Sequence, residues 1–223
     1  MGTSEKYVES YQKYLGLSLD DWIAYNKALV KKYPFLIPRN VFSGEIVNDY
    51  DYTWTEADVI PIGWRIAFGD LLLEELREEL IKFDYLDKYQ IVQIKEKYGS
   101  LRWYDNGYPQ GSNVPDILSK YEIISQNVCI MCGKPDVPMI NEWWVSPYCK
   151  DCFVKKELEY NKNDDPDKII EDYEKLKDSA EKIAEVYNIR RFSIGGYEDI
   201  KVDISDTVSK IRARYYGSDK NGC

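Results

Sequence analysis

The chain has 223 residues, of which 44% are hydrophobic and 14% aromatic, enough for one ordinary globular core and a smaller unit beside it. Its formal net charge of −9 argues against a general nucleic-acid coat, because phosphate binding requires an excess of lysine and arginine. The sequence contains no histidine, which excludes a three-histidine catalytic zinc, a histidine general base and the usual serine triad.

The N-terminal residues 1–14 are polar and mixed in charge, without the apolar stretch of a signal peptide. No window of the sequence approaches the roughly 18 continuous apolar residues that a membrane helix requires. We therefore expect a cytoplasmic protein without membrane contact. In a reducing cytoplasm, paired cysteines bind metals more often than they form disulfides.

The first elements are predicted to be helical. Residues 4–33 carry apolar side chains at helical spacing, interrupted by a break at 15–19 where Ser18 or Asp20 can cap the second part. Pro34 then ends the helix.

The next segment is predicted to be irregular, with an extended stretch at 35–37 between two prolines and a loop over 40–63. Within the loop, Asp49, Asp51, Glu56 and Asp58 form an acidic cluster among aromatic residues. Their spacing matches no cation-binding loop, so a solvated acidic loop is the favoured interpretation.

The middle of the chain predicts a helix over 64–83, a β-hairpin over 90–105 and a short helix over 116–125. In the hairpin, Gly99 and Ser100 suit a two-residue turn of type II′, which would place Lys97 opposite Arg102. Beyond residue 157, a helix is expected to begin at Pro166 after Asp165 as its cap, followed by one or two strands within 192–208.

The cysteines form the most specific motif, Cys129-x-x-Cys132 followed by Cys149-x-x-Cys152. Two such pairs about 16 residues apart are typical of a zinc ribbon, in which each pair lies in a tight knuckle. Gly133 allows the first knuckle to turn back with positive φ. Four thiolates leave no open coordination position, so the predicted zinc is structural rather than catalytic. Two redox pairs or an iron–sulfur cluster are the alternatives.

Strand alternation in the hairpin gathers cations on one face of an otherwise acidic protein. This face, called the hairpin face below, comprises Gln93, Lys95, Lys97, Arg102 and Tyr104. Like charges placed opposite each other cost stability, so either the protein's own carboxylates or an anionic ligand should offset them.

Four segments follow one another in the chain: YPFLIPRN at 33–40, GWRIAFG at 63–69, QIKEKYGSLRWY at 93–104 and CIMCGKP at 129–135. Together they resemble an uncharacterised family of zinc-ribbon proteins encoded by phages and prophages of Gram-positive bacteria. The resemblance covers residues 20–155. It implies a phage or prophage setting, but it assigns no activity and no catalytic residues. In that setting, a nucleic-acid accessory protein and a factor that blunts host defence are both plausible roles.

These observations predict an α+β fold, with helices around a small antiparallel hairpin and an embedded four-cysteine zinc ribbon. The expected parts are an α+β core over 1–125, the ribbon over 126–156, and a C-terminal segment over 157–223. That last segment either folds back or mediates homo-oligomerisation.

Three functions are compatible with this reading, and an enzyme is the least supported class. The first is counter-defence by capture of an anionic nucleotide. Its candidate ligand residues are Lys95, Lys97, Arg102 and Arg39 for phosphate, and Trp103, Tyr104 and Trp64 for stacking on a base. The second is a module that docks a host or phage protein. The third is nucleic-acid binding through the ribbon.

Overall fold

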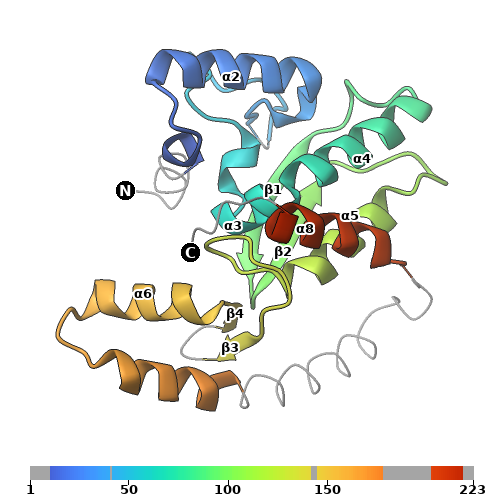
Figure 1. Cartoon of the computed structure of the whole chain (residues 1–223). Helices are drawn as coiled ribbons and strands as arrows, with labels where there is room; N and C mark the ends of the chain where they lie inside the picture. The colour runs from blue at the N-terminus through green and yellow to red at the C-terminus, as the bar shows by residue number, and fades with distance from the viewer. Residues whose placement is uncertain (1–10, 41, 142–144, 178–201, 218–223) are drawn as a thin grey trace.

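The computed structural model describes residues 11–40, 42–141, 145–177 and 202–217 (Figure 1). Helices surround two small antiparallel sheets of two strands each, β1–β2 and β3–β4. The α+β class predicted from the sequence is confirmed, including the gathered four cysteines.

The first long helix is α2, Leu19–Lys32, which follows a helical stretch over residues 11–15. The Ser18 hydroxyl accepts a hydrogen bond from the Asp21 N–H at 3.2 Å, so the predicted break and one of its two candidate caps are confirmed. Residues 4–10 of the predicted helix lie outside the described residues.

Pro34–Leu36 form a 3₁₀ turn, η1, so the extended stretch predicted over 35–37 is wrong at Phe35 and Leu36, whereas Ile37 is extended. Proline at the first position is compatible with a helical turn, and the Leu36 N–H donates to the Tyr33 carbonyl at 3.0 Å. Phe35 and Leu36 are buried in the main core, and their burial stabilises this turn.

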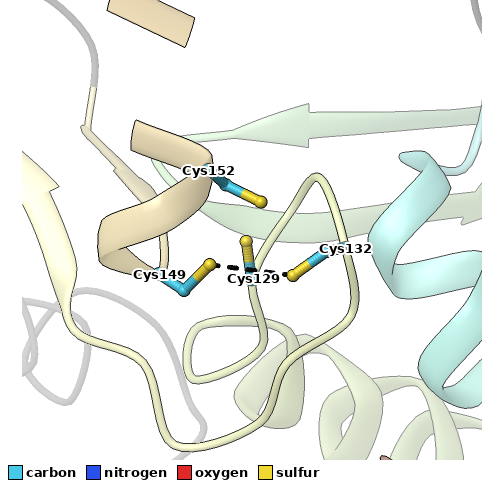
Figure 2. A group of neighbouring side chains, drawn as sticks. All are labelled: Cys129, Cys132, Cys149 and Cys152. Carbon is cyan, nitrogen blue, oxygen red and sulfur yellow. Dashed lines mark hydrogen bonds between the residues drawn. The ribbon is translucent and has the colours of Figure 1, made fainter. Parts of the chain in front are cut away.

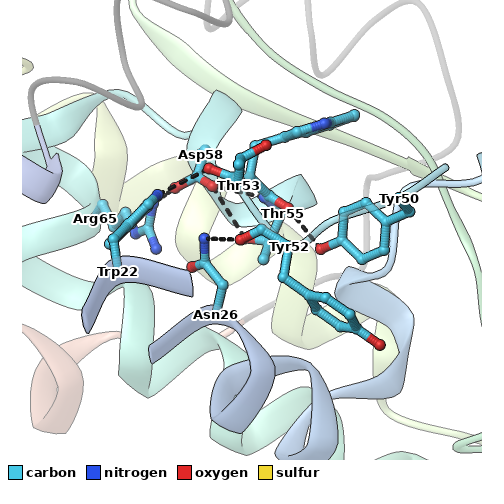
Figure 3. Close-up of polar contacts among 9 residues, drawn as sticks. Trp22, Asn26, Tyr50, Tyr52, Thr53, Thr55, Asp58 and Arg65 are labelled. Atoms are coloured by element: carbon cyan, nitrogen blue, oxygen red, sulfur yellow. Dashed lines mark hydrogen bonds and ion pairs between the residues drawn. The ribbon is translucent and has the colours of Figure 1, made fainter. Parts of the chain in front are cut away.

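The loop predicted over 40–63 is held against α2 by a polar network (Figure 3). The Trp22 indole N–H donates to the Thr53 carbonyl at 2.8 Å, and the Asn26 amide donates to the Tyr52 carbonyl at 2.9 Å. Asp58, in the 3₁₀ turn η2 (Glu56–Val59), is 1% exposed and forms a buried ion pair with Arg65. At Asp58 the expectation of a solvated acidic loop is therefore wrong.

The predicted helix at 64–83 begins slightly earlier and has three parts: α3 (Ile62–Trp64), a π turn (Arg65–Gly69) and α4 (Asp70–Lys82). Four apolar residues along one side of this helix, Phe68, Leu72, Leu76 and Leu80, are 0% exposed, whereas Phe83 at its end is 39% exposed. Arg65 lies in the π turn, where the Tyr11 ring stacks 3.8 Å from its guanidinium carbon.

The hairpin consists of β1 (Ile91–Lys97) and β2 (Ser100–Asp105), and α5 (Val114–Ser125) packs against β2. The turn is Tyr98-Gly99, with φ of 53° and 72°. Both values are positive, as in a type I′ turn. The predicted turn at Gly99-Ser100 is thus wrong by one residue.

This shift changes the cross-strand partners but not the composition of the faces. Lys95 lies opposite Arg102, Lys97 opposite Ser100, and Gln93 opposite Tyr104. Each residue of one strand moves by two positions relative to the other, so the parity is retained and the hairpin face keeps its predicted members.

The cysteine-bearing segment contains β3 (Met139–Asn141), β4 (Val145–Pro147) and α6 (Lys150–Tyr160). A helix over residues 166–177 follows and packs against α6 through a buried cluster that includes Ile169, Tyr173 and Phe153. Its start at Pro166 is confirmed. Trp143 and Trp144 lie outside the described residues.

The last described element is α8, Ser205–Gly217, which returns to the main core beside the π turn (Figure 1). Ile211 is 1% exposed within that core. A strand predicted to reach residue 208 is therefore wrong from Ser205 onward, and the rest of that prediction lies in residues that are not described. Among the described helices, none is both long and apolar enough to cross a membrane.

Candidate functional site

The four cysteines predicted as ligands converge on one point (Figure 2). Their sulfur atoms all lie within 4.8 Å of one another, and Cys132 Sγ and Cys149 Sγ are 3.7 Å apart. A tetrahedral site with metal–sulfur bonds of about 2.3 Å has an edge of about 3.8 Å, so this spacing fits four-thiolate coordination. The four cysteines are positioned to hold a metal ion.

The first pair lies in a tight knuckle, as predicted. The Gly133 N–H donates to the Cys129 carbonyl at 3.0 Å, and the Cys129 N–H donates to the Lys134 carbonyl at 2.8 Å. Gly133 has φ of 81°, the left-handed conformation that its position after the pair predicted.

The second pair does not form a matching knuckle, which corrects the expectation of a two-knuckle ribbon. Cys149 is the N-cap of α6 and Cys152 lies in its first turn. The N-terminal end of a helix stabilises negative charge, so it favours thiolates at these positions. Hydrogen bonds from the other thiols, that of Cys129 first, also lower the pKa of Cys149.

A CxxC pair at a helix start is also the geometry of disulfide exchange, but here the thiols are enclosed. Cys129, Cys149 and Cys152 are 0%, 3% and 5% exposed, whereas redox cysteines need access to a partner. Within the described residues no other group of cysteines and carboxylates gathers as this one does, so the acidic loop forms no comparable site.

The metal centre is fixed directly to the main core. The Gly63 N–H donates to the Ile130 carbonyl at 2.9 Å, and the Trp64 indole N–H donates to the Val128 carbonyl at 2.9 Å. A Cβ atom at Gly63 would lie 2.1 Å from the Cys129 carbonyl oxygen, so only glycine permits this approach.

The segment that carries the metal centre also contacts the tip of the hairpin. A Cβ atom at Gly99 would lie 2.1 Å from the Met139 methyl group and 3.2 Å from the Val145 carbonyl oxygen. The turn between β1 and β2 therefore rests on the β3–β4 sheet, and the metal centre supports the hairpin.

On the hairpin face, the three cations have different surroundings. Arg102 forms an ion pair with Glu122 of α5. The Lys95 ammonium donates to Gln93 Oε1 at 2.7 Å and lies 4.9 Å from the centre of the Tyr104 ring, and Lys97 lies 5.3 Å from that of Tyr98. Neither lysine has a carboxylate partner in the part of the chain that the structure describes.

The other three candidate ligand residues, Trp64, Trp103 and Arg39, do not lie on the hairpin face. Trp64 is 0% exposed, so the expectation that it stacks on a ligand is wrong. Trp103 belongs to the opposite face of β2 and donates its indole N–H to the Tyr89 hydroxyl at 3.0 Å. Arg39 donates to the Gly44 carbonyl of its own loop at 2.8 Å.

Two functional features were not predicted. Glu122 neutralises Arg102 from 20 residues away, and the buried Asp58–Arg65 pair joins the loop to the π turn. Neither carries a local motif, because each is made by elements that meet only in the fold.

Comparison of the chain with protein-family models, with curated proteins and with solved structures found no match. The functional argument therefore rests on the geometry of the site.

Proposed function

We propose that the protein is a zinc-stabilised binding protein without enzymatic activity, which captures an anionic ligand on the hairpin face. Four thiolates are the donor set that zinc takes in closed structural sites. The role of the zinc is to hold the knuckle, α6 and the hairpin tip together.

The observation that supports the binding function is that Lys95 and Lys97 lack a carboxylate partner among the described residues. Both lysines belong to the antiparallel hairpin. Tyr104, on the same face, is 46% exposed and offers part of its ring to a base. A nucleotide with at least two phosphate charges is the ligand class that these groups suit best.

This function also agrees with the phage context that the sequence resemblance implies. Capture of a nucleotide signal in the host cytoplasm needs no catalytic base, which suits a chain without histidine. Such capture would make the protein a counter-defence factor.

The test is calorimetry of the full chain against pyrophosphate and a panel of cyclic mono- and dinucleotides. The double variant Lys95→Gln/Lys97→Gln should weaken binding by about tenfold or more, because each lost charge-assisted hydrogen bond is worth over 1 kcal/mol. The matched control Lys162→Gln/Lys168→Gln removes the same charge from exposed positions elsewhere. Equal affinity of both variants, or no binding of any probe to the native chain, would refute the proposal.

A second candidate is docking of a host or phage protein, favoured by Phe42, which is 97% exposed on its loop. A stoichiometric partner recovered from host lysate by the native chain and lost with Phe42→Ser would favour it. Nucleic-acid binding is the third candidate, and a binding constant that does not fall with salt would exclude it.

A further inference from the structure

A cavity of about 320 Å³ lies where β2 meets α5. Four aromatic residues contribute to its lining, namely Trp103, Tyr104, Tyr108 and Tyr121. Tyr104 and Tyr108 are 46% and 45% exposed whereas Tyr121 is buried, so the lining runs from the surface into the main core. The volume is at the lower end of the range of about 300–1,000 Å³ for small-molecule sites, so the cavity suits one flat ring system.

The cavity adjoins the hairpin face through two pairs of residues. Tyr104 belongs to both, and the Lys95 ammonium lies 4.9 Å from the centre of its ring. Glu122 lines the cavity and forms the ion pair with Arg102 of the hairpin face. A ligand whose ring stacks in the cavity can therefore place an attached group beside Lys95.

The cavity and the hairpin face differ in charge, and this difference orients a ligand. Asp105 and Glu122 line the cavity, and among the described residues no lysine or arginine does. A phosphate group that entered the cavity would meet like charge, whereas Lys95 and Lys97 lie outside its lining and attract phosphate. An anionic ligand with a neutral aromatic end therefore binds with that end in the cavity and its phosphates on the two lysines.

Asp105 supplies hydrogen-bond acceptors to the cavity. Its Oδ2 accepts from the Tyr89 hydroxyl at 2.8 Å, and its Oδ1 accepts from the Gly107 N–H at 2.9 Å. These bonds hold the carboxylate in place and use two of the about four acceptor positions that a carboxylate has. The N1–H and N2–H₂ groups of guanine are neighbouring donors that match a carboxylate, whereas the same edge of adenine offers one donor group and one acceptor.

We propose that this cavity binds the guanine base of a nucleotide whose phosphates lie on the hairpin face. The inference rests on the proposed function, because the same lysines hold the phosphates, and it adds the identity of the base. Tyr104 and Tyr108 stack on the guanine ring. Asp105 accepts the hydrogens of N1 and N2 and so distinguishes guanine from adenine.

The experiment measures dissociation constants of the full chain by calorimetry for pyrophosphate, GDP, IDP and ADP. All four probes carry a diphosphate group. GDP should bind about tenfold more tightly than ADP, because only guanine can donate twice to Asp105. IDP lacks the N2 amino group and should have an intermediate affinity, and pyrophosphate, which has no ring to stack, should bind most weakly.

Variants of two lining residues test their separate roles. Asp105→Asn replaces one acceptor by a donor, so it should weaken GDP binding about tenfold and leave the affinity for pyrophosphate unchanged. Tyr108→Ala should weaken GDP binding about tenfold because stacking is lost, whereas Tyr108→Phe keeps the ring and should bind GDP as the native chain does. The matched controls Asp167→Asn and Tyr160→Ala change exposed residues of other helices and should have no effect.

Equal affinity of the native chain for GDP and ADP would overturn the guanine site, while binding of pyrophosphate would still support the proposed function. If Asp105→Asn loses affinity for pyrophosphate as well, the change has disturbed the hairpin, and the two Tyr108 variants decide. Equal GDP affinity of Tyr108→Ala and Tyr108→Phe would then overturn the proposal. Failure of all four probes to bind would refute the proposed function together with this inference.

Discussion

The main core and the metal centre are stabilised by different means. The core buries side chains from α2, the π turn, α4, the hairpin, α5 and α8. Around the metal centre, the buried described residues are three of the cysteines and Val137. A cluster of this size cannot offset the conformational entropy of its own loops. The main core can therefore fold by apolar burial, whereas we expect the metal centre to depend on a bound ion for its stability.

Metal removal should therefore have the largest effect, and it should be regional. Cys149→Ser should lower the zinc content from about one ion per chain to near zero, because metal affinity in such sites is folding free energy. Hydrogen exchange should accelerate over 128–160 and much less over 70–82. Mass spectrometry gives the metal content, and hydrogen exchange of the same sample gives the protection of each region. Uniform loss of protection along the chain would show that the core also depends on the ion.

A substitution at the junction between the main core and the metal centre should have the second largest effect on stability. In Gly63→Ala, the new Cβ would meet the Cys129 carbonyl oxygen at 2.1 Å and the Gly133 nitrogen at 2.7 Å. We expect a loss of about 3 kcal/mol or more in unfolding free energy, because neither backbone group can move without disturbing the knuckle. Gly217→Ala is the control, since nothing lies within 4 Å of its Cβ position. Similar denaturation midpoints for both variants would argue against a tight junction.

The regions should respond to pH with opposite signs. Burial raises the pKa of Glu56, beside the core, to about 7. Its folded pKa lies above the unfolded value, so stability present below pH 4 is lost as the pH rises toward 7, by roughly 3 kcal/mol. The metal centre instead gains stability over this range, because its thiols must lose protons to bind the ion.

Glu56→Gln isolates this contribution. The variant should gain stability relative to the native protein at pH 8 and show little difference at pH 4, as measured by urea denaturation of the zinc-loaded protein. A constant difference between the two proteins at both pH values would show that Glu56 does not titrate in this range.

The smallest effect is expected at the ion pair between α8 and the knuckle. Arg212 donates to both oxygens of Asp136, at 2.8 and 2.6 Å, but the two side chains are 52% and 43% exposed. A double-mutant cycle with Arg212→Gln and Asp136→Asn should give a coupling energy below about 1 kcal/mol, as for other solvated pairs. A coupling of more than about 2 kcal/mol would mean that α8 and the metal centre fold as one unit.

The sequence was most informative where one residue type decides the chemistry locally. The two CxxC pairs identified the metal ligands, Ser18 identified a helix cap, and the parity of β1 and β2 identified the hairpin face. It was misleading where two local solutions compete. Gly99 suits the first position of one turn and the second position of another, and packing of the tip on Met139 accompanies the second.

Long-range relations were not accessible from the sequence. Trp64 stands in one of the four segments that carry the family resemblance, yet it is buried and donates its indole N–H to the Val128 carbonyl. The pairing of Arg102 with Glu122 depends on how α5 crosses β2, and no periodicity within either element encodes that crossing.

The return of α8 to the core has a consequence for synthesis. Ile211 completes a cluster that begins at Val30, and Arg214 binds Asp70 across 144 positions of the chain. While the polypeptide is still emerging from the ribosome, α8 is not yet available to cover the part of the core beside the π turn. Until residues 205–217 are synthesised, the core therefore lacks Ile211, and a chaperone has apolar surface to bind.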